Sequence, residues 1–159
     1  MIDLTTTRVF KEFVTGDLSL NEFERWIKTD ANLMKQLDKV DYQSLVNFDM
    51  GIRDSNIEFE LRNLVSYIWA RNIAPNQEVE VTRTILTGMI DGTVGIIEGC
   101  RELSRLFWQG NGFIPIIFVG YDSELDAAID ENSDVVSWYR EAVLIEANKL
   151  ILLLNNRNI

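Results

Sequence analysis

Histidine is absent from this sequence, and cysteine occurs once, at Cys100. Without histidine, the chain lacks the commonest general base, the histidine-dependent catalytic triads and the usual ligands of zinc and non-haem iron sites. A single cysteine cannot form an intramolecular disulfide, which favours a reducing, cytoplasmic compartment. We find no catalytic or phosphate-binding motif among the remaining residues. The sequence therefore predicts a protein that is not an enzyme and holds no metal or cofactor.

Long hydrophobic runs are also missing. The longest one near the C-terminal end, residues 150–154, is far too short to span a bilayer. The first residues, 1–5, lack the basic segment and the hydrophobic run of a signal peptide. We therefore expect a cytoplasmic protein without a membrane segment.

Basic side chains are scarce, with 15 Lys and Arg against 25 Asp and Glu, so the formal net charge is −10. This balance disfavours binding to nucleic acid or to an anionic membrane, and it suits a cationic partner. Many acidic proteins have no basic partner, so charge alone leaves the question open. The 159 residues are 47% hydrophobic and include four tryptophans. We expect one domain, spanning residues 1–159, with a substantial core.

Capping signals and apolar periodicity predict helices along most of the chain. Ser19 and Glu22 have the spacing of a capping box, ahead of a helix over about 20–28. Ser55 and Glu58 repeat that spacing ahead of an amphipathic helix at 56–72. Further helices are predicted over residues 5–15, 80–90 and 93–108. The predicted fold is an all-α, single-domain helical bundle.

Two segments are harder to assign. Residues 113–120 are rich in β-formers, but Pro115 argues against a central strand, so a short strand and a buried extended loop remain open. The last predicted helix, 134–155, is apolar around most of its circumference, which is typical of a helix in the centre of a core.

Four glycines, spaced four, three and four residues apart, precede and enter the helix predicted at 93–108. Each costs a helix about 1 kcal/mol relative to alanine, so the spacing predicts close helix packing, with a break near Gly92. At an inward position of the same segment, Cys100 is expected to be a small buried hydrophobe. The glycines are Gly88, Gly92, Gly95 and Gly99.

The densest charge in the chain is a run of six acids without a base. The run would fit a helix start with Ser123 as its cap, since acids favour the first turn. It would equally fit a docking face for a cationic protein, and the two interpretations are compatible. A calcium-type site is disfavoured because the glycine and the closing glutamate of an EF-hand are missing. The six acids are Asp122, Glu124, Asp126, Asp130, Glu131 and Asp134.

Several short motifs resemble signatures of one group of small bacterial proteins. Residues 18–26 (LSLNEFERW) are similar to the opening motif of that group, and residues 42–48 (YQSLVNF) to its next element. Later signatures resemble residues 95–103, residues 121–126 and Trp138. The group is the immunity proteins of contact-dependent growth inhibition and related polymorphic toxin systems.

The resemblance implies a protein that binds a cognate toxin domain, often a nuclease, in the cytoplasm and blocks it without catalysis. It implies a scaffold role for Trp26, Gly95, Gly99 and Arg101, and it transfers no contact residue. Because the acidic run is suited to a cationic partner, we predict that the six acids form the toxin-binding surface. Two alternatives remain open: a homo-oligomeric helical scaffold that pairs through 93–108 and 134–155, and a carboxylate–metal hydrolase.

Overall fold

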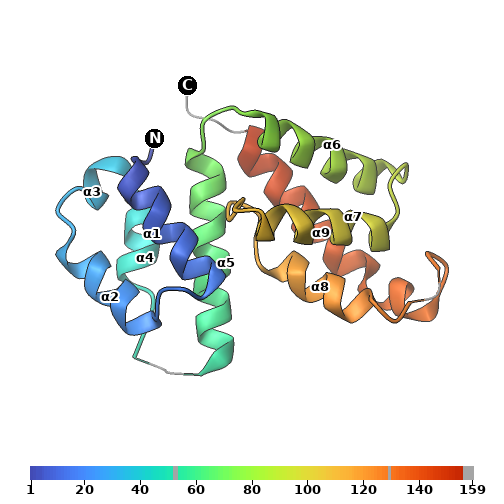
Figure 1. The fold of residues 1–159 in the computed structure, drawn as a ribbon, viewed down its shortest axis with the longest axis horizontal. Helices are drawn as coiled ribbons and strands as arrows, with labels where there is room; N and C mark the ends of the chain where they lie inside the picture. The colour runs from blue at the N-terminus through green and yellow to red at the C-terminus, as the bar shows by residue number, and fades with distance from the viewer. Residues whose placement is uncertain (52–53, 129, 156–159) are drawn as a thin grey trace.

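The computed structural model describes residues 1–51, 54–128 and 130–155, and α-helices account for most of them (Figure 1). No strand occurs in these ranges, so the predicted all-α fold is confirmed, and the helices pack into a single compact domain. The helices of the described residues are α1 Leu4–Thr15, α2 Leu20–Thr29, α3 Leu33–Gln36, α4 Lys39–Val46, α5 Ser55–Asn72, α6 Gln77–Asp91, α7 Ile96–Trp108, α8 Ile117–Leu125 and α9 Asp134–Asn155.

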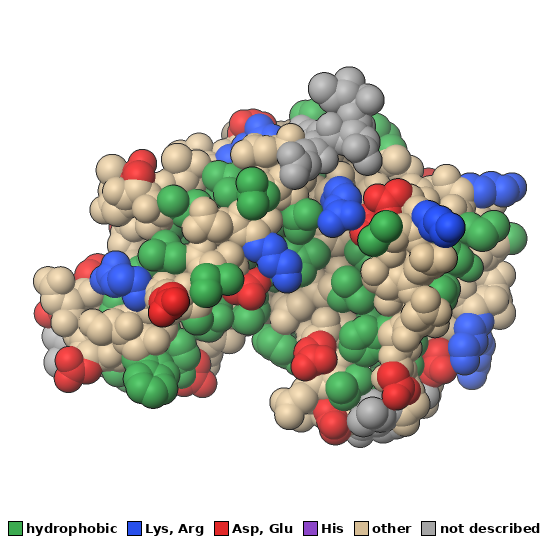
Figure 2. All heavy atoms as spheres, turned by 180° about the vertical axis from the view of Figure 1, so that it is seen from behind, with side chains coloured by type: hydrophobic (Ala, Val, Ile, Leu, Met, Phe, Trp, Pro, Cys, Tyr) green, Lys and Arg blue, Asp and Glu red, His purple; other side chains and the backbone are tan. Residues whose placement is uncertain are grey.

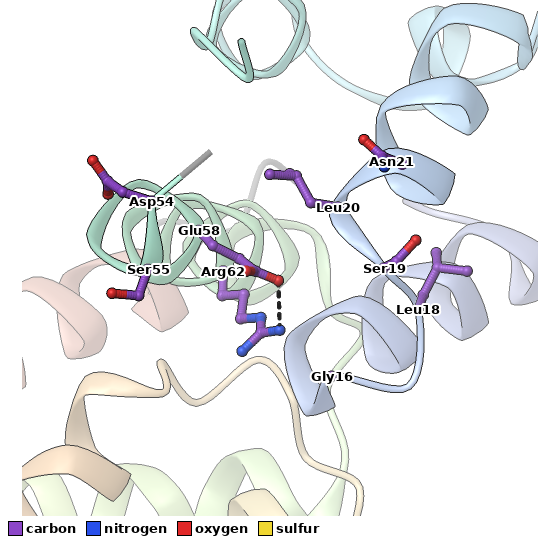
Figure 3. A pocket seen from close by; sticks show the side chains of 9 residues that line it. All are labelled: Gly16, Leu18, Ser19, Leu20, Asn21, Asp54, Ser55, Glu58 and Arg62. Carbon is purple, nitrogen blue, oxygen red and sulfur yellow. Dashed lines mark hydrogen bonds and ion pairs between the residues drawn. The ribbon is translucent and has the colours of Figure 1, made fainter. Parts of the chain in front are cut away.

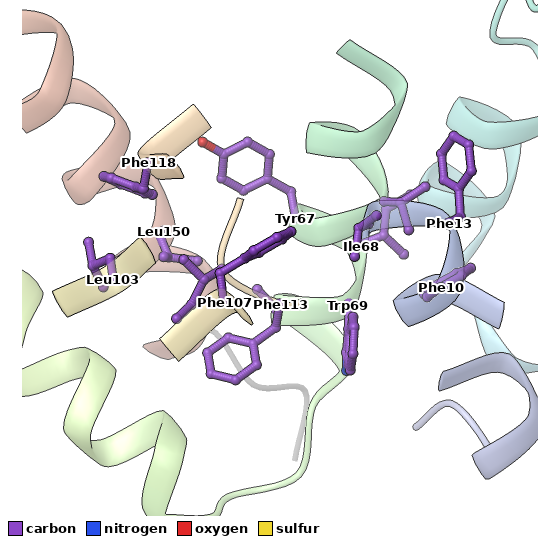
Figure 4. Close-up of a cluster of buried hydrophobic side chains, with 14 of the residues drawn as sticks. Phe10, Phe13, Tyr67, Ile68, Trp69, Leu103, Phe107, Phe113, Phe118 and Leu150 are labelled. Atoms are coloured by element: carbon purple, nitrogen blue, oxygen red, sulfur yellow. The ribbon is translucent and has the colours of Figure 1, made fainter. Parts of the chain in front are cut away.

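The central helix is α5. It separates α1–α4 from α6–α9 and contacts α1 and α4 on one side and α9 on the other (Figure 1). Figure 4 shows Phe10 and Phe13 on the α1 side of α5, and Phe107, Phe113 and Leu150 on the opposite side. The prediction that the last helix lies in the centre of the core holds for one of its faces and not for the other. Helix α9 packs on α5, α6, α7 and α8 through one face only.

The N-caps follow the predicted chemistry, but one lies earlier than expected. At α2 the capping box is present: Ser19 Oγ accepts from the amide of Glu22, and Glu22 Oε2 accepts from the amide of Ser19. At α5 the cap is Asp54 rather than Ser55, because Asp54 Oδ1 accepts from the amide of Ile57 at 2.8 Å. At α4 the cap is Asp38, and Asp41 lies inside the helix.

Residues 113–120 form neither a strand nor an extended loop. After Gly110, which has a φ of 102°, the chain turns, and α8 begins at Ile117. Asn63 on α5 supplies the missing cap, since its Oδ1 accepts from the amide of Ile117 at 3.0 Å. Phe113, Ile114 and Phe118 are all buried. The β-formers here reflect burial, and burial is also what β-propensity scales largely measure.

The glycines of the α6–α7 region permit close packing, as predicted. Gly92 ends α6 with a φ of 86°, a conformation that glycine adopts without steric cost. Gly99 lies against Met89, so the absence of a side chain lets α7 approach α6. In addition, no described helix is both long enough and apolar enough to cross a membrane.

Two glycines make a matched test of the packing. A Cβ at Gly112 would lie 2.5 Å from the Trp69 ring and 2.7 Å from Val14 Cγ2, whereas one at Gly120 in α8 would meet nothing within 4 Å. We expect Gly112→Ala to destabilise the protein by about 1–3 kcal/mol through overpacking. We expect Gly120→Ala to stabilise it by up to about 1 kcal/mol through helix propensity. Urea unfolding measures both, and effects of the same sign would contradict this packing.

Candidate functional site

The six acids of the run, which we call the acidic edge, lie where α8 ends and α9 begins. Asp122 and Glu124 are in α8, Asp126 follows it, and Asp134 is the first residue of α9. The prediction of a helix start at Ser123 was wrong, because Ser123 lies inside α8, which ends at Leu125. Acids near a helix C-terminus are disfavoured by the helix dipole. Local helix chemistry therefore does not explain Glu124 and Asp126.

Glu131 points into the molecule, towards the N-terminus of α7. Its Oε2 accepts from the amide of Ile96 at 2.7 Å, and its Oε1 accepts from the amide of Ile97 at 2.9 Å. The helix has no cap of its own, because its N-cap residue is Gly95. Any Cβ at Gly95 would collide with this carboxylate. Glu131 thus caps a helix 35 residues away in sequence and belongs to the scaffold of the acidic edge.

Three further contacts hold the acidic edge in place. The Tyr139 hydroxyl donates to Glu124 Oε2 at 3.2 Å, and Arg140 Nη2 donates to the Glu131 carbonyl at 3.2 Å. The rings of Tyr121 and Tyr139 meet edge to face, with centroids 6.0 Å apart. Desolvation first, then the Glu124 carboxylate, raises the pKa of Tyr139, so the phenol stays protonated and can donate. These contacts join α8 to α9 and Glu131 to α9.

The other acids of the edge remain open to solvent. Glu124, Asp126, Asp130 and Asp134 are exposed, and Asp122 is half-buried. Within the described ranges, none of the six carboxylates forms an ion pair with a Lys or Arg side chain. In the described residues the carboxylates of the edge are therefore free of direct ion pairs, and the nearest bonded cation, Arg140, binds the Glu131 carbonyl.

The acidic edge is poorly shaped for a metal. Asp122 and Glu124 are two residues apart in α8, and side chains at that spacing on a helix point in different directions. No group of three or more His, Cys, Asp or Glu side chains in the described part of the chain could hold a metal ion. The carboxylate–metal hydrolase has no geometric support.

Helix α9, one of the two segments through which the homo-oligomer alternative would pair, carries an exposed apolar face. Trp138 is 83% exposed, and Ile145 and Leu152 are 57% and 58% exposed. Helix α9 passes behind α7 in Figure 1, and Figure 2 views that side, where hydrophobic side chains reach the surface. The sequence already indicated apolar residues around the whole circumference of this helix. Such a helix can bury one apolar face in the core and leave the other exposed.

Other polar clusters are structural. Asp41 is buried and binds Arg71 Nη1 at 3.0 Å, which joins α4 to α5. Burial raises the pKa of Asp41, and Arg71 opposes this shift. A cavity of about 480 Å³ lies where α2 and α5 begin, and its Arg62 binds Glu58 at 2.8 Å (Figure 3). The cavity contains Ser19 and Ser55, but Ser19 caps α2 and Glu58 is paired with Arg62, so their roles there are structural.

Cys100 is fully buried, as expected. Burial, with smaller contributions from the carboxylates of Asp122 and Glu131, raises the pKa of the thiol from 9.0 to about 12. The reactive form of cysteine is the thiolate, so this residue is unsuited to nucleophilic chemistry at neutral pH.

Comparisons with known proteins assign neither a family nor a function, because no family model, no curated protein and no solved structure matches this chain. The resemblance to immunity proteins and the toxin-binding role stay predictions.

The cap at α7 can be tested directly. Glu131→Ala should lower the free energy of unfolding by about 1–2 kcal/mol, because two amides lose a charged acceptor at the positive end of a helix dipole. Hydrogen exchange at the amides of Ile96 and Ile97 should speed up most. Asp126→Ala is the control, since its exposed side chain makes no hydrogen bond within the described ranges, and it should change stability by less than about 0.5 kcal/mol. Equal effects would contradict the assigned role of Glu131.

The burial of Cys100 predicts low thiol reactivity. At pH 8, a pKa of about 12 instead of 9.0 lowers the thiolate fraction roughly 1,000-fold, and burial also blocks access. The native protein should therefore react with a chromogenic disulfide reagent at least about 1,000-fold more slowly than the urea-unfolded chain. Comparable rates in the two states would contradict both the burial and the raised pKa.

Proposed function

We propose that this protein is a non-catalytic inhibitor of the immunity type, which binds a cationic toxin domain in the cytoplasm through the acidic edge. The observation that carries the proposal is that exposed carboxylates of the edge have no basic partner in the described structure, although the edge itself is held in place. The motif resemblance and the net charge of −10 support the same conclusion.

A nuclease toxin is the partner class best matched to this surface. Nucleases hold phosphates with Lys and Arg, and carboxylates presented by an inhibitor can pair with the same side chains. Asp126, Asp130 and Asp134 are the residues we assign to this contact, with Glu124 beside them. Asp122 is half-buried and Glu131 is turned inward, so both act through the shape of the edge.

Pre-organisation explains why an acidic surface would be built on such a turn. Ordering a mobile segment on binding costs free energy, and the contacts that Glu131 and Tyr139 already make in the free protein avoid part of that cost. Unpaired carboxylates also steer a cationic partner during encounter, an effect that acts over about 10 Å at 0.1 M salt.

The first experiment asks whether inhibition occurs. The chain is co-expressed in a bacterial host with a panel of polymorphic-toxin domains, nucleases included, each under separate induction. We expect growth to be restored against one domain or a few related ones, and the purified pair to form a complex. Failure to protect against any cationic toxin in the panel, together with failure to bind any of them, would refute the proposed function.

The second experiment tests the surface. The triple variant Asp126→Lys, Asp130→Lys, Asp134→Lys should associate with the toxin domain at least about tenfold more slowly at low salt. The difference should shrink near 1 M salt, where the Debye length is about 3 Å. Stopped-flow mixing or surface plasmon resonance measures the rate constants.

The matched control makes the same change of net charge elsewhere. Asp17→Lys, Glu60→Lys, Glu78→Lys replaces three exposed acids outside the acidic edge. This variant should keep most of the wild-type association rate. If the two triple variants slow association equally, net charge rather than the acidic edge governs the encounter.

A further inference from the structure

The outer face of α9 carries a regular row of side chains, which we call the α9 stripe. Successive members are separated by three, four, three, four and three residues, the spacing of a coiled-coil seam. Five turns of the helix contribute to it, and four of its six members are exposed large hydrophobics. The stripe consists of Val135, Trp138, Ala142, Ile145, Lys149 and Leu152.

This row is separate from the residues that anchor α9 in the core. The buried residues of α9 are Val136, Val143, Ala147, Leu150 and Leu154. Single exposed hydrophobic residues are common on protein surfaces, but a row at seam spacing along a whole helix is not explained by chance exposure. The helix therefore has two apolar faces, and only one of them is covered within the monomer.

We propose that the α9 stripe is the interface between two copies of this chain, paired with their α9 helices antiparallel. The spacing is symmetric about the midpoint between Ala142 and Ile145. An antiparallel pair consequently matches every member of the stripe with a member of the other copy. Val135 meets the partner's Leu152, Trp138 meets the partner's Lys149, and Ala142 meets the partner's Ile145.

Charge favours a second copy in this orientation. Lys149 Nζ already lies 4.2 Å from the centroid of the Tyr67 ring. In the pair, the partner's Trp138 adds a second aromatic face to the same cation, and Trp is the best side chain for such contacts. The only positive charge in the stripe thus meets its only aromatic ring across the interface.

The antiparallel arrangement also separates the acidic edges. Each acidic edge lies at the N-terminal end of α9, a helix of 22 residues that is about 33 Å long. A parallel pair would bring both edges, and both copies of Asp134 and Glu141, side by side. An antiparallel pair places them at opposite ends, beyond the Debye length of about 8 Å at physiological salt.

The size of the stripe predicts a reversible dimer. The stripe runs from residue 135 to 152, so a face about 27 Å long and about 10 Å wide offers on the order of 270 Å², well below the roughly 800 Å² per partner of a standard stable interface. We therefore expect a dissociation constant in the micromolar range rather than an obligate dimer. The proposal does not depend on the proposed function, because the stripe leaves both acidic edges free.

The first test is the mass of the purified chain as a function of concentration, by sedimentation velocity and light scattering. The average mass should rise from that of one chain near about 1 µM towards twice that value by about 1 mM. Trp138→Ser and Ile145→Glu should each weaken the dimer at least about tenfold, with unchanged thermal melting of the dilute monomer. Trp108→Ser is the matched control, because Trp108 is 58% exposed on α7 and lies outside the stripe.

Two outcomes overturn the proposal. A mass of one chain over the whole concentration range would mean that the stripe is either bare or covered by a different protein. A dimer that Trp108→Ser disrupts and Trp138→Ser does not would place the interface elsewhere.

The second test fixes the orientation without altering the stripe. Glu141 and Asn148 are exposed residues that flank it. In the antiparallel pair, Glu141 lies beside the partner's Asn148. A mixture of Glu141→Cys and Asn148→Cys proteins should therefore give mixed dimers with a short bis-maleimide, while either variant alone gives few. In a parallel pair the two copies of this flank lie on opposite sides of the seam, so a failure to form mixed dimers at concentrations where the protein is dimeric would overturn the proposed arrangement. The native thiol does not interfere, because Cys100 is buried.

Discussion

Helix α5 is buried along two opposite sides, and the arrangement of the other helices follows from this constraint. Leu61 and Val65 lie on one face of the helix and Ser66 and Ala70 on the opposite face, and all four are 0% exposed, so packing covers the helix on both sides. The α1–α4 group covers one side, and α9 covers the other. Because α9 takes that place, α6, α7 and α8 pack around it, and the junction of α8 with α9 falls at the far end of the molecule from α1 (Figure 1).

The acidic edge shows how one side chain can determine the role of its neighbours. Glu131 and Glu124 are the same residue type and belong to the same acidic run. Only Glu131, however, binds the two amides at the start of α7. The Glu131 carboxylate stabilises the N-terminus of α7, which has no cap of its own, and at the same time anchors the segment that carries Glu131. Glu124, Asp126, Asp130 and Asp134 remain exposed, while Glu131 anchors the acidic edge to α7 from inside. A binding surface of this kind combines rigid support with unpaired charge.

Two surfaces of different character therefore lie along α9. The acidic edge at its N-terminal end is suited to long-range attraction of a cationic domain, which depends on salt and acts mainly on the rate of encounter. The α9 stripe is suited to short-range apolar contact, which acts mainly on the lifetime of a complex. In an antiparallel pair the two edges face away from each other, so a dimer would present two separate binding sites.

The sequence by itself determined the helical class, the capping box at Ser19 and Glu22 and the helix end at Gly92, because these depend on residues within one or two turns. It also determined the negative charge, which depends on composition alone. Only the tertiary structure decided that residues 117–125 are helical, since Asn63 caps them from 54 residues away. It also turned Glu131 inward, through a contact 35 residues distant. Periodicity identified α9 as apolar all round. Which of its faces the core covers depends on how α5, α6, α7 and α8 pack against it, and no local pattern encodes that choice.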